Sequence, residues 1–185
     1  MKYFIIILTI LMLFNCKNLN GYQNQHTYKT FNDIVYKITK QQKGTKILLN
    51  PKIINLKNKF SKDFFNKELI NRYGKNDVIG VDSEKVKSLV ANTDIEEIII
   101  ENSKENIFND DKFNFPYQFA KTIEDDLLTK PIYRFSKPVL FNNKEYCLIY
   151  YEYYCGLDCG EGNLMIFVKK DRVWRIYTKL PIWIT

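Results

Sequence analysis

The spacing of hydrophobic positions changes along the chain, from a helical period in the first half to a period of two in the last third. Residues 28–42 carry apolar side chains at every third or fourth position, which predicts an amphipathic helix that stops before Gly44. Related patterns predict further helices over residues 61–73, 83–90 and 117–128, and strands over residues 46–56 and 95–100. The first half of the chain is therefore expected to be mainly helical.

From Ile132 onward apolar and polar residues alternate, which is typical of half-buried strands. The alternation places Trp174 and Ile176 in the core, and turn-forming residues at 141–144 and 170–172 divide the region. The predicted strands span residues 132–140 with a break at Pro138, then 145–155, 161–170 and 173–183. We therefore expect an α+β fold in which N-terminal helices pack on a C-terminal antiparallel β-meander of about four strands.

The first 16 residues have the pattern of an export signal. Lys2 precedes an apolar run that is shorter than the roughly 20 residues of a transmembrane helix. The run ends at Leu13-Phe14-Asn15-Cys16, which resembles the lipobox of bacterial lipoproteins, where the cysteine becomes the lipidated first residue. An uncleaved anchor helix or a buried cysteine is the alternative interpretation. The expected division of the chain is a signal peptide over 1–15, a lipidated Cys16 with a flexible tether over 16–27, and a single domain over 28–185.

Composition excludes several kinds of chemistry. The chain has 28 Lys and Arg against 21 Asp and Glu, but the basic residues are scattered and form no block of the kind that nucleic-acid binding requires. The single histidine, His26, lies in the tether, so histidine-dependent hydrolase sites and most zinc sites lack their central residue. We therefore expect no nucleic-acid partner, no metal, no cofactor and no catalytic residue.

Cys155 and Cys159 bracket a glycine-rich hairpin tip. In an oxidising envelope, this separation allows a disulfide that shapes the tip. Two free thiols are one alternative. Redox catalysis or metal binding is another, but the spacing is Cys-x3-Cys, and no helix N-terminus is expected there to lower a thiol pKa. Cys147 lies in mid-strand and is expected to be a small core residue.

The run from Tyr150 to Tyr154 places aromatic side chains on both faces of one strand. Cross-strand packing is the simpler interpretation. The alternative is an exposed aromatic platform with Glu152 as its polar anchor, suited to a glycan or a peptide. The candidate binding residues on this face and at the adjoining tip are Tyr150, Glu152, Tyr154, Leu157 and Asp158.

Several motifs together resemble a group of uncharacterised lipoproteins of Bacteroidota. Besides the lipobox-like start, they are Ser136-Lys137-Pro138-Val139-Leu140-Phe141, Tyr154-Cys155-Gly156 with Cys159-Gly160-Glu161-Gly162, Val173-Trp174-Arg175-Ile176, and the terminal Trp183-Ile184-Thr185. The resemblance covers the last third of the chain well and the middle hardly at all. It implies an envelope compartment and the C-terminal hairpins, but no chemistry.

These patterns favour a lipid-anchored envelope protein in the outer membrane, facing the periplasm, that binds a protein or cell-wall partner without catalysis. One alternative is an inhibitor or immunity-type lipoprotein that uses the hairpin tip as a wedge. Another is an envelope thiol-redox or hydrolytic enzyme, which the absence of a usable histidine disfavours.

The lipobox-like sequence predicts that Cys16 is acylated and becomes the first residue of the mature protein. Two or three acyl chains would anchor it stably, whereas a single chain binds a membrane only marginally. Mass spectrometry of the membrane fraction should find the acylated Cys16 peptide, and Cys16→Ser should abolish it. An intact Met1, or an unmodified secreted form, would contradict the prediction.

Overall fold

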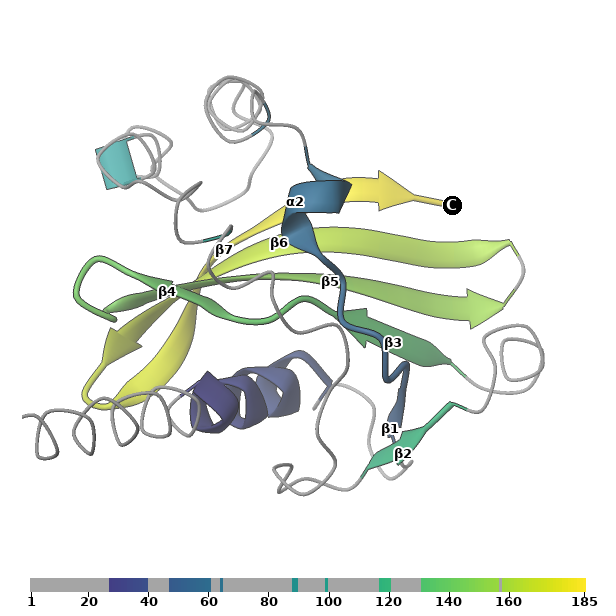
Figure 1. Ribbon diagram of the computed structural model, residues 1–185, viewed down its shortest axis with the longest axis horizontal. Coiled ribbons are helices and arrows are strands. Elements are labelled where there is room, and N and C mark those ends of the chain that lie inside the picture. Colours follow the sequence, from purple (N-terminus) through teal and green to yellow (C-terminus); the bar gives the residue numbers. More distant parts are fainter. Residues whose placement is uncertain are drawn as a thin grey trace, which may run out of the picture.

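The computed structural model describes residues 27–39, 47–60, 64, 88–89, 99, 117–120, 131–156 and 158–185. Its strands are β1 (Ile47–Leu49), β2 (Tyr117–Phe119), β3 (Ile132–Phe135), β4 (Val139–Phe141), β5 (Tyr146–Gly156), β6 (Cys159–Lys170) and β7 (Val173–Ile184). They form one sheet in the order β2-β1-β3-β5-β6-β7, with β4 also paired to β5 (Figure 1). In the described part of the chain, residues 27–39 form a helix, and α2 (Leu56–Lys59) is a short helix of four residues.

The sheet is mixed and has seven strands, so the predicted fold of helices packed on a four-stranded meander is wrong. The antiparallel pairing of β5, β6 and β7 does follow the predicted order. The observed sheet differs from the predicted antiparallel meander at β1, which pairs in parallel with both β2 and β3. β1 lies within the strand predicted over residues 46–56, but strands as short as β1 and β2, with three residues each, do not indicate in the sequence which partners they pair with.

Two predicted elements change type in the structure. Residues 117–119 form strand β2, although the sequence pattern predicts a helix over 117–128, because they pair with β1 along their whole length. Ile99 is helical, whereas the pattern predicts a strand over residues 95–100. The predicted helices over 61–73 and 83–90 lie outside the described residues except at 64 and 88–89. The predicted signal peptide and Cys16 also lie outside them.

Hydrophobic cores cover both faces of the sheet. Phe31, Ile34 and Val35 of the helix at 27–39 are buried on one face, as the helical period predicts. The other core contains Leu56 of α2 and Phe60, and Figure 1 shows α2 and the longer helix on opposite sides of the sheet. In the described part of the chain, no helix is both long enough and apolar enough to cross a membrane.

Two turns fix the register of the long hairpins. Asn142, Asn143 and Lys144 between β4 and β5 have φ values of 47°, 53° and 64°. Asp171 and Arg172 between β6 and β7 have φ values of 51° and 63°. Two successive residues with positive φ give a turn whose twist matches that of the flanking strands. Both turns lie where the sequence predicts them.

Trp174 is buried as predicted, with 2% of its surface exposed, but Ile176 is 55% exposed and its assignment to the core is wrong. Both residues lie on β7, which ends the strand order. A side chain on a terminal strand is buried only where another element covers it. Trp174 joins the core beneath the helix at 27–39, whereas Ile176 lies outside it.

This difference predicts unequal effects of truncation at the two sites. Trp174→Ala should lower the free energy of unfolding by about 3–5 kcal/mol, the range for emptying a large aromatic site. Ile176→Ala serves as the matched control and should change it by no more than about 0.5 kcal/mol. Urea denaturation followed by circular dichroism measures both values, and equal losses would show that Ile176 is covered in solution.

Candidate functional site around Glu152

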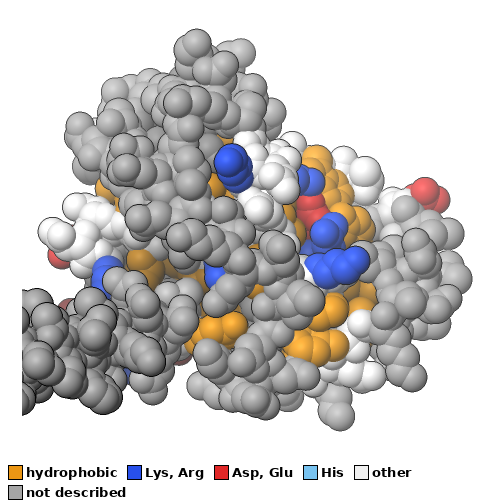
Figure 2. All heavy atoms as spheres, in the orientation of Figure 1, with side chains coloured by type: hydrophobic (Ala, Val, Ile, Leu, Met, Phe, Trp, Pro, Cys, Tyr) orange, Lys and Arg blue, Asp and Glu red, His pale blue; other side chains and the backbone are white. Residues whose placement is uncertain are grey.

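Glu152 is an acidic residue enclosed by the sheet and by α2. Its side chain is 2% exposed, in the second half of β5. The strand register places it opposite Arg134 of β3 on one side and Gly162 of β6 on the other. In the view of Figure 2, basic side chains lie beside an acidic side chain and hydrophobic ones.

Four side chains donate hydrogen bonds to the Glu152 carboxylate. Oε1 accepts from Lys59 Nζ at 2.6 Å and from the Tyr150 hydroxyl at 3.0 Å. Oε2 accepts from Arg134 Nη1 at 3.0 Å and from the Tyr154 hydroxyl at 3.0 Å. Two carboxylate oxygens offer about four acceptor positions in all. These donors therefore occupy the whole carboxylate and provide the pairing that a buried charge requires.

The same contacts keep Glu152 ionised. Burial by itself would raise its pKa, because it removes water from the charged form. The hydrogen bond and charge of Lys59, the charge of Arg134 and the Tyr154 hydroxyl outweigh burial and hold the pKa of Glu152 below its ordinary value. A carboxylate that stays ionised and has no open acceptor position is poorly suited to act as a general acid or a general base.

Burial and the neighbouring carboxylate raise the pKa of Tyr150 and of Tyr154. Both phenols therefore keep their protons at neutral pH and can donate to Glu152. Tyr150 also accepts a hydrogen bond, from the Trp183 indole nitrogen at 2.9 Å. The network consequently extends from β5 to the last strand of the sheet.

Trp183 lies against the two glycines on β6. A Cβ on Gly162 would overlap the indole nitrogen and come 2.5 Å from the Tyr150 hydroxyl, and a Cβ on Gly160 would come 3.1 Å from the ring. The indole centroid is 5.6 Å from that of Tyr154. Gly160 and Gly162 thus provide the space that the Trp183 ring occupies beside the tyrosines.

The hairpin tip is at the end of β5 and β6 beyond this network. Cys155 and Cys159 lie at disulfide distance, with their Cα atoms 5.1 Å apart. The β5–β6 register shifts between Tyr154 and Gly156, so the extra residue lies at Cys155. Asp158 is exposed at the tip, and Leu157 lies outside the described residues. Cys147 is buried as expected.

The structure places Tyr150, Glu152 and Tyr154 together on one face, but it buries the first two. An approaching molecule would meet Tyr154 and Trp183, which are both partly exposed. The sequence pattern did not identify Lys59, Arg134 or Trp183 as neighbours of Glu152. The only signal was the glutamate itself, because an acid within an aromatic strand needs cationic partners, although nothing local says which ones.

No protein-family model, no curated protein and no solved structure matches the chain. Within the residues that the structure describes, no group of three or more His, Cys, Asp or Glu side chains could hold a metal ion.

The Glu152 network predicts a specific acid dependence of stability. Its folded-state pKa is lowered, so its contribution is complete above the unfolded value of about 4.3 and is lost as the pH falls through the folded value. Glu152→Gln should lower the free energy of unfolding at pH 7 by about 3 kcal/mol, because it leaves two cations without their counter-charge. The difference from the wild type should narrow as the medium becomes acidic.

Denaturant titrations at neutral and acidic pH measure this difference. Glu161→Gln is the matched control, because Glu161 pairs with Lys179 at 3.3 Å at the solvent-exposed edge of the other face. Glu161→Gln should lower the free energy of unfolding by less than about 1 kcal/mol. A constant difference between wild type and Glu152→Gln at every pH would contradict the ionised state of Glu152.

Proposed function

We propose that the protein is a lipid-anchored component of the bacterial cell envelope that acts by binding a protein or cell-wall partner. In this proposal Cys16 carries the lipid, and the surface beside Trp183, Tyr154 and the hairpin tip makes the contact. The observation that carries the proposal is the complete occupation of the Glu152 carboxylate. It supports binding over catalysis, because the carboxylate has no acceptor position left for a substrate proton or a metal.

The other reactive groups in the described residues favour the same interpretation. Among the described residues, Glu152 is the one acidic residue that is buried. Burial raises the pKa of the Cys147 thiol, which keeps it protonated and unreactive. Cys155 and Cys159 lie at disulfide distance in a strand hairpin, where no helix N-terminus stabilises a thiolate.

A rigid end of the sheet suits recognition. The disulfide pair, the Trp183 ring against two glycines and the Glu152 network all restrain the same end of β5 and β6. A surface that is ordered before it meets its partner loses less conformational entropy on binding. The partly exposed rings of Trp183 and Tyr154 offer the flat apolar contact that sugars and peptide side chains use.

The position of the tip also supports the inhibitor or immunity-type alternative. The pairing of β3 with β5 ends at Tyr154, and that of β7 with β6 ends near Gly160. The segment from Cys155 to Cys159 therefore extends past both neighbouring strands. A short stiff projection of this kind fits the cleft of a toxin or hydrolase, and inhibition of a captured enzyme would favour this alternative.

The double change Cys155→Ser, Cys159→Ser tests the role of the tip. On the chain-entropy model, releasing so small a loop should lower the free energy of unfolding by about 2 kcal/mol, so the domain should stay folded. If the tip is the recognition surface, the folded variant should retain less partner than the wild type, because the loop must then be ordered on binding. Circular dichroism verifies the fold.

Binding is measured by cosedimentation with purified cell-wall sacculi and by crosslinking in envelope fractions. Asp158→Ala with both cysteines intact should weaken the same interaction, and Lys144→Ala, at the turn between β4 and β5, is the matched surface control. The proposal that the tip binds fails if the folded double-Ser variant recovers every partner at wild-type yield.

A further inference from the structure

The end of the sheet opposite the tip combines exposed apolar side chains with basic ones. Tyr36, Val173 and Ile176 are 52%, 49% and 55% exposed, and three of the four large hydrophobic residues most exposed in the described structure are at this end. Tyr36 and Val173 line one pocket of about 400 Å³, between the helix at 27–39 and the β6–β7 turn. Two of these three exposed apolar side chains therefore line one pocket, and Ile176 lies near it on β7, two residues after Trp174.

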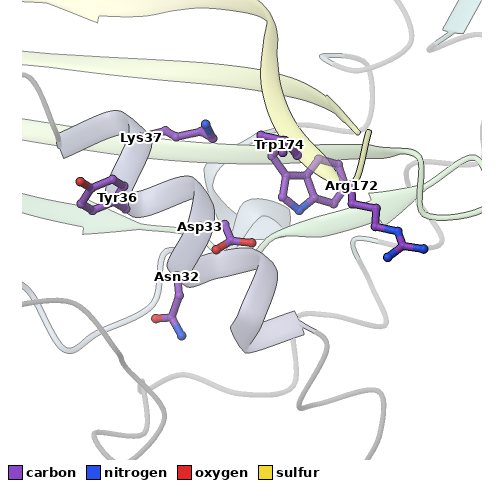
Figure 3. A pocket seen from close by; sticks show the side chains of 7 residues that line it. Asn32, Asp33, Tyr36, Lys37, Arg172 and Trp174 are labelled. Atoms are coloured by element: carbon purple, nitrogen blue, oxygen red, sulfur yellow. The ribbon is translucent and has the colours of Figure 1, made fainter. Parts of the chain in front are cut away.

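Figure 3 shows how this pocket is built. Asp33 and Lys37 project from the helix on the side of Trp174, and the Arg172 side chain extends outward from the turn. Lys169 lies 5.5 Å from the centroid of the Trp174 ring. The pocket thus has the Trp174 ring in its lining and cationic side chains beside it.

The charge around the pocket is predominantly positive. The helix at 27–39 and residues 169–176 together contain six basic and two acidic residues. They are Lys29, Lys37, Lys169, Lys170, Arg172 and Arg175 against Asp33 and Asp171. Lys29, Asp33 and Lys37 are four residues apart and therefore share one stripe of the helix.

We infer that this surface, made of the outer stripe of the helix at 27–39 and the β6–β7 turn, docks on an anionic phospholipid bilayer. Exposed aromatic and aliphatic side chains among Lys and Arg are what peripheral membrane surfaces use: the apolar groups enter the interface and the cations meet lipid phosphates. The Lys37 and Arg172 side chains supply the charge complementarity, and Tyr36, Val173 and Ile176 supply the apolar contact. The inference rests on the lipid anchor proposed above.

The position of this surface along the chain supports a bilayer over another partner. The described part of the helix begins at Thr27, and 10 residues separate Thr27 from Cys16. Even fully extended, 10 residues span at most about 36 Å. An anchored Cys16 would therefore keep the helix close to the membrane, so a weak surface attraction is sufficient to orient the domain.

Hydrogen–deuterium exchange of the full lipidated protein in liposomes tests the inference. One liposome contains phosphatidylglycerol and phosphatidylcholine, and the other contains phosphatidylcholine alone. On the anionic liposome, amides of residues 171–176 should exchange at least about five-fold more slowly, since each Lys or Arg near an anionic surface strengthens the contact by roughly that factor. Amides at 158–160 in the tip should exchange equally in both.

The slowing should disappear in 1 M salt, where the screening length falls to about 3 Å. It should also disappear in Lys37→Glu, Arg172→Glu, which reverses two charges beside the pocket. The matched control is Lys52→Glu, Lys57→Glu, which makes the same change in net charge at two exposed positions near α2. The control variant should behave as the wild type.

The outcomes separate this inference from the proposed anchor. Protein that fails to float with either liposome overturns the anchor, and docking with it. Protein that floats but shows no slowing at 171–176 overturns docking and leaves the anchor in place. Equal slowing on both liposomes overturns docking on anionic lipid. Slowing that grows with protein density on the membrane also overturns it, because a second copy of the protein would then cover the surface.

Discussion

The ionised carboxylate of Glu152 is the constraint on which the hairpin-tip end of the sheet depends. A charge that is almost fully buried must be matched by donors, and its four donors come from α2, β3 and β5. Lys59 is 93 residues away in the sequence, so α2 can reach this position only when β1, β3 and β5 have paired as they do. Buried ion pairs contribute little net stability compared with apolar packing, but an unpaired one is costly. The network therefore disfavours other arrangements more than it strengthens this one.

The same constraint determines the shape of the tip. Tyr150 donates to Glu152 and accepts from Trp183, so the last strand is held at a fixed position across β6. The indole can take that position only because Gly162 and Gly160 have no side chain. The glycines near the tip therefore do more than permit a turn: they make room for an aromatic ring that closes the sheet beside the partly exposed surface.

Local sequence signals account for the elements that were predicted correctly. Alternation and turn residues with positive φ define β5, β6, β7 and the turn at Asp171 and Arg172. They do not reveal β2, which is too short to show a period, or the parallel partners of β1, which are distant in the sequence. Ile176 has the pattern of a core residue but lacks a covering element. Only part of the site could be predicted from the sequence, for a similar reason. Tyr150, Glu152 and Tyr154 share a strand face by local geometry. Lys59, Arg134 and Trp183 reach that face through tertiary packing, which local patterns do not show.

The two proposed surfaces, at the hairpin tip and at the β6–β7 turn, lie at opposite ends of one strand. In this arrangement, docking at the turn would orient the tip for binding. β6 runs 12 residues from Cys159 at the tip to Lys170 beside the turn. At about 3.3 Å per residue, it separates the two ends by roughly 36 Å. A domain held at the turn by anionic lipid, with its anchor nearby, would point the stiffened tip away from the bilayer. The tip could then reach partners beyond the headgroup layer, and orientation by the bilayer would reduce the rotational freedom lost when a partner binds.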